Sequence, residues 1–158
     1  MALSPFQTLL DSHGRDVHRF LTANVGPVDA DDCWQETWLS ALRAYPSLQD
    51  ASNLRAWVFT IAHRKIIDHV RARGRRAIPV AEAAELASTD AAAATALPDE
   101  ELWSSVAQLP DKQRTAVTLR FLIDSSHGEI AQVMGTSEEA ARRNVHEALK
   151  RLRKEVQR

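Results

Sequence analysis

Apolar residues recur through most of the chain at the three- and four-residue spacing of helices that bury one face. In the first half, three stretches of this kind predict three successive helices, because cap-type residues precede each stretch and helix-ending residues follow it. The expected start and end residues are, in order, Ser4 and Gly26, Asp29 and Pro46, and Asn53 and Gly74. The first half is therefore expected to form a bundle of three or four helices.

A second helical pattern begins near Pro98. Pro110 is expected to open a helix, residues 127–134 a short helix, and Ser137 to cap a long helix that reaches the C-terminus. Gly135 lies between the last two helices, where a tight turn needs a permissive backbone. A short helix, a glycine turn and a long helix follow the plan of a helix-turn-helix.

The segment between the two halves has a different composition. From Ala81 to Ala96, nine of sixteen residues are alanine and Leu86 is the only bulky aliphatic residue, so this segment is not expected to anchor a core. Alanine also favours helix, which leaves both an extended and a partly helical linker open. The expected fold is all-α, with two small helical bundles, residues 1–76 and 98–158, joined by a flexible acidic linker, residues 77–97.

Charge is segregated along the chain although the formal net charge is only −1. Seven basic residues and one acid lie between Arg55 and Arg76, and seven basic residues and two acids lie between Arg142 and Arg158. Between them, residues 77–111 hold seven acids and no Lys or Arg. Two basic poles around an acidic middle favour contact with a polyanion at two places, although two solvated helix faces would give the same pattern.

The last helix has the clearest division into two faces. Its apolar positions are expected to pack inward together: Ala141, Val145, Leu149, Leu152 and Val156. The opposite face carries Arg142, Arg143, Asn144, His146, Glu147 and Lys150. Arg and Asn near the start of such a helix are residue types that reach base edges in a major groove, and Lys further along suits phosphates. The pattern predicts a DNA-reading helix.

Three segments resemble sigma factors of bacterial RNA polymerase. Residues 109–154 resemble region four, which implies recognition of the promoter −35 element. Residues 29–45, DADDCWQETWLSALRAY, resemble the region-two helix that binds the clamp helices of the largest polymerase subunit. Residues 54–76 resemble the following helix, which faces the melted −10 element. The order of these segments, and the absence of any resemblance to the extra domains of housekeeping factors, imply the extracytoplasmic-function (ECF) group.

The resemblance implies specific residues and partners. Polymerase binding would fall to Asp32, Gln35, Glu36 and Leu39. Contact with the −10 element would fall to Ser47, Gln49, Asn53, Arg55, Arg64 and Arg71. Contact with the −35 element would fall to Ser137, Arg142, Arg143, Asn144, His146 and Lys150. The implied partners are promoter DNA and core RNA polymerase, through the clamp helices of its largest subunit and the flap of its second subunit, and an anti-sigma factor is a further partner that the resemblance allows.

The polymerase-binding residues also make physical sense without the resemblance. Asp32, Gln35 and Glu36 are spaced so that one helical face carries them, with Leu39 one turn further on. Acids placed only to favour the start of a helix would explain Asp32 but not Gln35 and Glu36. Trp57 shares the inner stripe of its helix, so burial is expected rather than base stacking.

Two departures from the family pattern bear on the DNA contacts. His63-Arg64 stands where the group commonly has Arg-Asn, so the promoter sequence does not transfer. Ser125-Ser126-His127 replaces a more usual apolar start of the short helix, and fraying is expected there.

Enzyme chemistry has little support in the sequence. The six histidines form no HExxH motif and no i, i+4 pair, no glycine-rich phosphate loop is present, and Cys33 is the only cysteine. No catalytic residue, metal, cofactor or small-molecule substrate is expected.

One cysteine excludes an intramolecular disulfide, and residues 1–10 lack the basic-then-apolar order of an export signal, so a cytoplasmic location is expected.

Two other classes of protein remain open on the residues alone. A stand-alone helix-turn-helix regulator would use its N-terminal helices to dimerise or to sense a ligand, and it would bind a specific duplex without polymerase. A helical adaptor that has lost DNA binding would have its basic faces buried.

Overall fold

The computed structural model describes residues 3–76 and 100–156, and all of its regular elements within those ranges are helical. The first bundle consists of α1 (Phe6–Val25), α2 (Pro27–Ala44), the short 3-10 helix η1 (Tyr45–Ser47) and α3 (Leu54–Arg76). The second bundle consists of α6 (Glu100–Ala107), α7 (Asp111–Phe121), α8 (His127–Met134) and α9 (Glu138–Val156). The all-α fold is confirmed. The expected linker, residues 77–97, lies outside the described residues.

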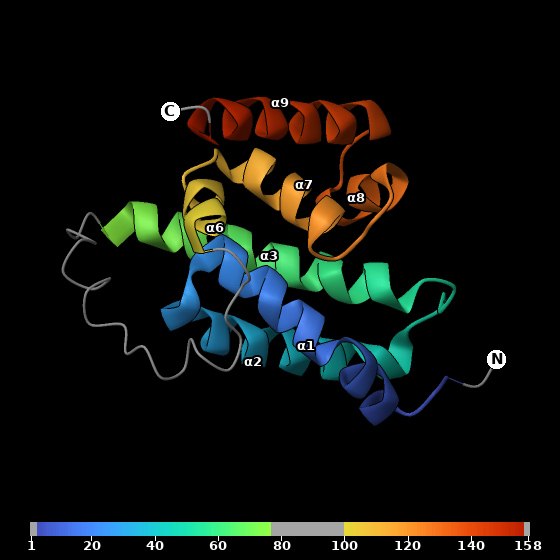
Figure 1. Ribbon diagram of the computed structural model, residues 1–158. Coiled ribbons are helices and arrows are strands. Elements are labelled where there is room, and N and C mark those ends of the chain that lie inside the picture. Colours follow the sequence, from blue (N-terminus) through green and yellow to red (C-terminus); the bar gives the residue numbers. More distant parts are fainter. Residues whose placement is uncertain (1–2, 77–99, 157–158) are drawn as a thin grey trace.

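The helices are stacked in layers, with α9 at one side, α7 and α8 next to it, α3 in the middle, and α1 and α2 beyond (Figure 1). In the first bundle, α1, α2 and α3 contact one another pairwise. Phe20 of α1 and Phe59 of α3 lie edge to face with ring centroids 5.4 Å apart, and both side chains are fully buried. The apolar residues that predicted these helices therefore form their common core.

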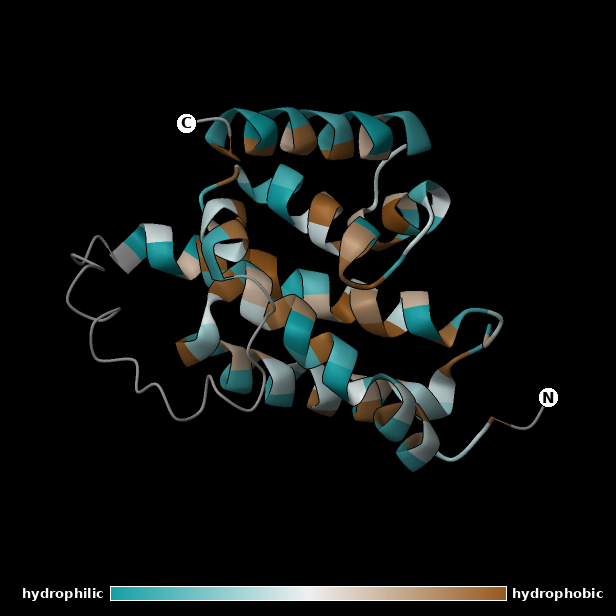
Figure 2. Cartoon of the chain, viewed as in Figure 1, coloured by the Kyte–Doolittle hydropathy of each residue, from teal (hydrophilic) through white to brown (hydrophobic). Residues whose placement is uncertain are grey.

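In the second bundle, α9 lies across α7 and α8 with its apolar face inward and its polar face outward (Figure 2). Ala141, Val145 and Leu152 are buried as expected, whereas Val156, the last residue of the predicted stripe, is 74% exposed. Val156 instead lies beside residues of α6 at the open edge of a groove on the outer side of this bundle. Gly135 has φ 63°, a left-handed conformation that favours glycine and gives the turn of the helix-turn-helix.

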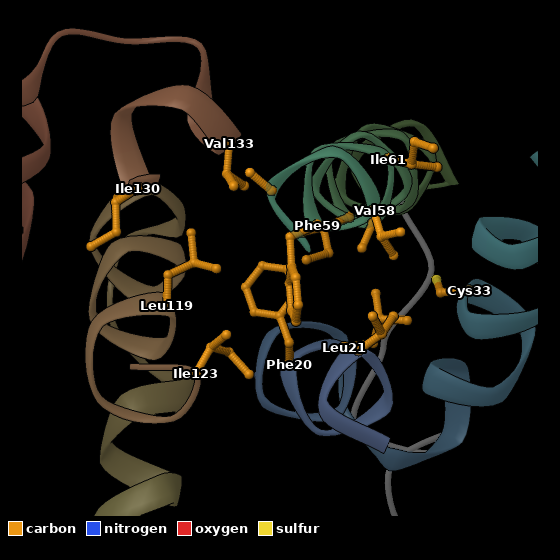
Figure 3. Packing of buried hydrophobic residues seen from close by; sticks show 14 of the residues in the cluster. Phe20, Leu21, Cys33, Val58, Phe59, Ile61, Leu119, Ile123, Ile130 and Val133 are labelled. Carbon is orange, nitrogen blue, oxygen red and sulfur yellow. The ribbon is translucent and has the colours of Figure 1, made fainter. Parts of the chain in front are cut away.

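The two bundles pack against each other through one apolar core. Helix α3 contacts α8, and α1 contacts α7. The buried residues that meet there are Phe20 and Phe59 from the first bundle and Leu119, Ile123, Ile130 and Val133 from the second (Figure 3). The fold is thus two bundles that share part of their interior, rather than two bodies that meet only through a linker.

Three predicted helix ends are wrong. Pro5, not Ser4, is the N-cap of α1, and the Ser4 carbonyl instead accepts a hydrogen bond from the Tyr45 hydroxyl. Helix α2 begins at Pro27 rather than at Asp29, because Gly26 turns the chain at φ 88° and proline suits a first helical position. Helix α3 continues through Gly74, since one glycine costs a helix only about 1 kcal/mol relative to alanine.

The start of α8 is capped, contrary to the fraying expected there. The Ser126 hydroxyl accepts a hydrogen bond from the Glu129 backbone N–H at 3.1 Å. Ser125 is buried, and its carbonyl accepts from Arg120 at 3.0 Å. The polar residues that replace an apolar helix start therefore hold the turn through hydrogen bonds. The caps predicted at Asn53 and Ser137 are confirmed, with bonds of 3.1 Å to the Ala56 and Ala140 N–H groups.

The shared core predicts a large effect of one aromatic side chain. Phe59→Ala should lower the free energy of unfolding by about 3 to 5 kcal/mol, because it removes a fully buried ring and leaves a cavity. Chemical denaturation followed by circular dichroism measures the change. Phe121→Ala is the matched control, since that ring is 60% exposed and should cost less than about 1 kcal/mol. Equal losses in the two variants would contradict the assignment of Phe59 to the core.

Candidate polymerase-binding and nucleic-acid interfaces

Helix α2 presents the four residues predicted for polymerase binding on one exposed face. Asp32, Gln35, Glu36 and Leu39 are all exposed, Leu39 by half of its surface. The other side of the helix is anchored by Trp38, which is buried with its ring 5.8 Å from that of Phe6. The face is therefore mixed, with two acids and an amide beside an exposed leucine.

The acids at the start of α2 divide into two groups. Asp31 accepts a contact from His18 of α1, with Nε2 and Oδ1 2.7 Å apart. Asp29 lies 3.2 Å from Nε2 of His69 on α3. These two carboxylates connect the helices of the first bundle, whereas Asp32 points outward with the polymerase-binding face.

The residues predicted for the −10 element are not gathered at one place. Ser47, Gln49 and Asn53 lie in the exposed segment between α2 and α3. Arg64 and Arg71 are exposed further along α3, a helix of about 35 Å at 1.5 Å per residue. The Asn53 carbonyl oxygen is occupied by its helix cap, and the Ser47 hydroxyl donates to the Ala44 carbonyl at 3.1 Å.

Arg55 is turned toward the second bundle instead of toward solvent. Its Nη2 donates to the Ile123 carbonyl and lies 3.5 Å from the Ser125 hydroxyl, and its Nε lies 3.4 Å from Oε1 of Glu129. The charged atoms of this pair are only partly exposed, with side-chain exposures of 34% and 19%. A residue predicted to contact DNA thus connects the two bundles.

The residues predicted for the −35 element lie along α9. Arg142, Arg143, His146 and Lys150 are exposed, and Arg142 pairs with Glu138 at 2.8 Å. The Ser137 hydroxyl is occupied as the cap of α9. The first turn of α9 exposes two acids, Glu138 and Glu139, and the basic side chains follow from Arg142 to the last turn, as the sequence predicts.

A groove of about 620 Å³ runs between the bundles, and some residues of each predicted DNA surface line it. Arg143 and Asn144 line it from α9, and Arg71 and His63 line it from α3. The predicted −35 residues therefore divide between solvent and this groove.

Sequence reasoning missed a second polar contact between the bundles. The Asn24 side-chain N–H donates to the Thr118 hydroxyl at 3.1 Å, and the Thr115 hydroxyl donates to the Asn24 carbonyl oxygen at 3.3 Å. All three side chains are buried. The sequence held one sign of this contact, since Asn24 stands in an apolar helix segment and a buried asparagine needs hydrogen-bond partners.

The second bundle also has an apolar groove on its outer side, of about 450 Å³, between α6, α7 and α9. Its walls include Trp103, Val117 and Leu149, and the exposed Phe121 and Val156 lie at its edge. A contiguous apolar surface of this kind is typical of a protein-binding site.

Within residues 3–76 and 100–156, no group of three His, Cys, Asp or Glu residues is placed to hold a metal ion. Burial raises the pKa of the Cys33 thiol to about 11, with smaller contributions from Glu36, Asp29 and Asp32. That thiol therefore stays protonated at neutral pH and is a poor nucleophile. No helix in this part of the chain is long and apolar enough to cross a membrane.

Comparison with known proteins gives two family matches in the same order as the two bundles. Residues 9–76 match the model of sigma-70 region 2, and residues 99–152 match that of sigma-70 region 4. The ECF RNA polymerase sigma factor SigD of Mycobacterium tuberculosis is 33% identical over 151 residues, which cover 89% of this chain and 71% of SigD. SigF of Caulobacter vibrioides, another ECF sigma factor, is 34% identical over 137 residues, covering 84% of this chain and 73% of SigF.

A solved structure has the same fold. The sigma factor RpoE of Bartonella quintana, crystallised with the anti-sigma factor NepR, superposes with a TM-score of 0.77, and the match covers 96% of each chain. The two sequences are 22% identical, so this likeness concerns the fold.

The lowered pKa of His63 implies that the stability of the fold depends on pH. Burial lowers its pKa below the ordinary 6.5, Arg64 lowers it further, and the Val133 backbone acts in the opposite direction. The other charged residues that line the same groove are Arg71, Asp111, Lys112 and Arg143.

Because the unfolded chain binds the His63 proton more readily, the free energy of unfolding should decrease as the pH falls below about 6.5. His63→Gln should flatten this decrease in denaturation curves recorded between about pH 7 and 5. His146→Gln, at an exposed position of α9, serves as the control. An unchanged slope in His63→Gln would contradict the prediction.

Proposed function

The chain belongs to the sigma-70 family as an RNA polymerase sigma factor of the ECF group, and from this premise we propose how its two bundles divide promoter recognition. Residues 1–76 bind core polymerase and the −10 element, and residues 98–158 read the −35 element, with residues 77–97 as the tether. One observation carries this division: each bundle presents an exposed face of the required chemistry, mixed acidic and apolar on α2, and basic on the helix-turn-helix.

Polymerase binding is assigned to the face of Asp32, Gln35, Glu36 and Leu39. Such a face suits a partner helix that offers basic and apolar side chains. The acids and the amide supply orientation through charged hydrogen bonds, and the half-exposed leucine supplies apolar area. Two tryptophans on the inner side of α2 fix the helix to the bundle. Trp38 is buried, and the indole N–H of Trp34 donates to the Gly14 carbonyl of α1 at 2.8 Å.

The apolar groove between α6, α7 and α9 is assigned to the flap of the second polymerase subunit. The groove offers an apolar floor that suits an apolar segment of a partner. Contact of each bundle with a different subunit would place the two DNA-reading faces at a distance from each other.

DNA contact is assigned to the basic poles. The loop of Ser47, Gln49 and Asn53 supplies polar groups for unstacked bases of the −10 element, and Arg64 and Arg71 of α3 hold the adjacent phosphates. On α9, Arg142 and Arg143 reach base edges of the −35 element, and Lys150 meets phosphate further along. The match of residues 9–76 to region 2 disfavours a stand-alone regulator, which has no use for a polymerase-binding helix.

The protein acts without a catalytic step of its own, in the cytoplasm where polymerase and DNA are, and an anti-sigma factor regulates it. The complex of RpoE with NepR supports the last point, because that sigma factor has the same fold.

Loss of the α2 face should abolish polymerase binding. The triple variant Asp32→Ala, Gln35→Ala, Glu36→Ala should no longer co-purify with core polymerase, while its circular dichroism stays that of the wild type. The matched control replaces Gln132, Glu139 and Glu155, an amide and two acids exposed on the second bundle. Undiminished recovery of polymerase with the α2 variant would remove the assignment.

Loss of a base-edge contact and loss of a phosphate contact on α9 should affect promoter binding in different ways. Arg143→Ala, or Arg142→Ala, should cost about 1 to 3 kcal/mol and relax preference at one or two promoter positions, because a base-edge contact is lost. Lys150→Ala should weaken all promoters alike and reduce the magnitude of the slope of log K against log salt by about one, because one phosphate contact is lost.

The measurement is competition among −35 variants by holoenzyme assembled with each mutant, titrated over salt. If the arginine variants leave the rank and the affinity of every promoter unchanged, α9 is not a reader of base edges.

A further inference from the structure

One acid in the first turn of α9 contacts an arginine that the proposed function assigns to base edges. Glu138 accepts a hydrogen bond from Nη2 of Arg142, one helical turn further on, at 2.8 Å. The neighbouring acid, Glu139, makes no ion pair in the part of the chain that the structure describes. Two adjacent acids of the same turn thus differ in one contact, which joins Glu138 to a DNA-reading side chain.

The carboxylate of Glu138 also lies against the other helix of the helix-turn-helix. The start of α9 is beside α8 (Figure 1). Oε2 of Glu138 lies 3.8 Å from the position that a Cβ of Gly128 would take, in the first turn of α8. A helix N-terminus favours a negative charge. The carboxylate is therefore placed between the start of α8 and the Arg142 guanidinium.

Other cationic groups lie close to this acid. Arg120 donates to the Ser125 carbonyl in the turn that leads into α8. Desolvation lowers the pKa of His127, Arg120 and Arg142 lower it further, and Glu138 acts in the opposite direction. Glu138 is thus the acid in a cluster that otherwise carries positive charge.

The contact of Glu138 with Arg142 contributes little to folding, because the two side chains are 53% and 61% exposed to water. Its effect is on the freedom of the guanidinium. An arginine that moves freely can turn from a base edge to a phosphate, and a phosphate contact gives affinity without sequence information. A guanidinium held at one amino group keeps its other N–H groups for a planar acceptor such as the edge of guanine.

On the premise of the proposed function, we propose that Glu138 is a positioning residue for −35 recognition, which holds the Arg142 guanidinium toward base edges and away from phosphates. Loss of the carboxylate then makes Arg142 a less selective cation. Two quantities should change together. Preference at the base pairs that Arg142 reads should fall, and the magnitude of the slope of log K against log salt should rise by up to about one, because Arg142 gains a phosphate contact.

The test uses holoenzyme assembled from the full chain and core polymerase. Its probe is a promoter that the wild-type holoenzyme transcribes in run-off assays, with each −35 base pair replaced in turn. Glu138→Ala removes the carboxylate. Glu139→Ala is the matched control, because it removes an equal charge from the same exposed turn. Both changes are also made together with Arg142→Ala, which completes a double-mutant cycle.

Glu138→Ala should reduce preference at one or two −35 positions about three- to tenfold, whereas Glu139→Ala should leave preference at its wild-type value. In the Arg142→Ala background, Glu138→Ala should change preference no further. Equal relaxation by the two acid variants would overturn the proposal, since the lost charge alone would explain it. An effect of Glu138→Ala that is as large without Arg142 as with it, or no effect at all, would overturn it too.

A failure of this role is distinct from a failure of the proposed function. If Arg142→Ala relaxes preference and Glu138→Ala does not, only the positioning role of Glu138 is rejected. If Arg142→Ala itself leaves preference unchanged, the assignment of Arg142 to base edges is wrong, and the role of Glu138 is rejected with it. If the wild type gives no run-off transcription with core polymerase, the proposed function and the role of Glu138 are both rejected.

Discussion

The packing of α3 is the constraint on which the rest of the molecule depends. This single helix contacts α1 and α2 on one side and α8 on another, and its remaining surface carries the arginines of the first basic pole. Phe59 lies on the part of α3 that contacts both bundles. It is fully buried against Phe20 and the apolar side chains of the second bundle (Figure 3). A helix that is apolar on two sides has only a narrow strip left for polar function. The α3 residues that we propose for DNA contact are therefore confined to that strip.

The distribution of charge follows from the same division. Some acids of α2 meet histidines of neighbouring helices, as Asp31 does with His18, and so connect the helices of the first bundle. Acids outside it, such as Asp32 and Glu36, remain exposed for a protein partner. A nearly neutral chain can thus carry an acidic face and basic faces that do not cancel, because charge interactions at the surface fade over about 8 Å in physiological salt.

Local features of the fold could be predicted from the sequence, and tertiary ones could not. Asn53 and Ser137 cap their helices as expected, because the cap involves neighbouring residues only. The exposed face of α2 could also be predicted from the sequence, since helical spacing alone brings its four residues together. The contact between the bundles was not, because Ile130 and Val133 show the same apolar pattern whether they face their own bundle or the other. For the same reason, nothing local distinguishes Arg55 from the arginines that stay in solvent.

The contact between the bundles need not be strong to keep the chain closed. Two parts of one chain meet at an effective concentration of about 1 mM, so even a contact with a dissociation constant of about 0.1 mM would keep roughly nine chains in ten closed. The apolar core supplies most of such an affinity, and the pairs made by Asn24 and Arg55 determine its register, since a misplaced contact would leave buried polar groups unsatisfied.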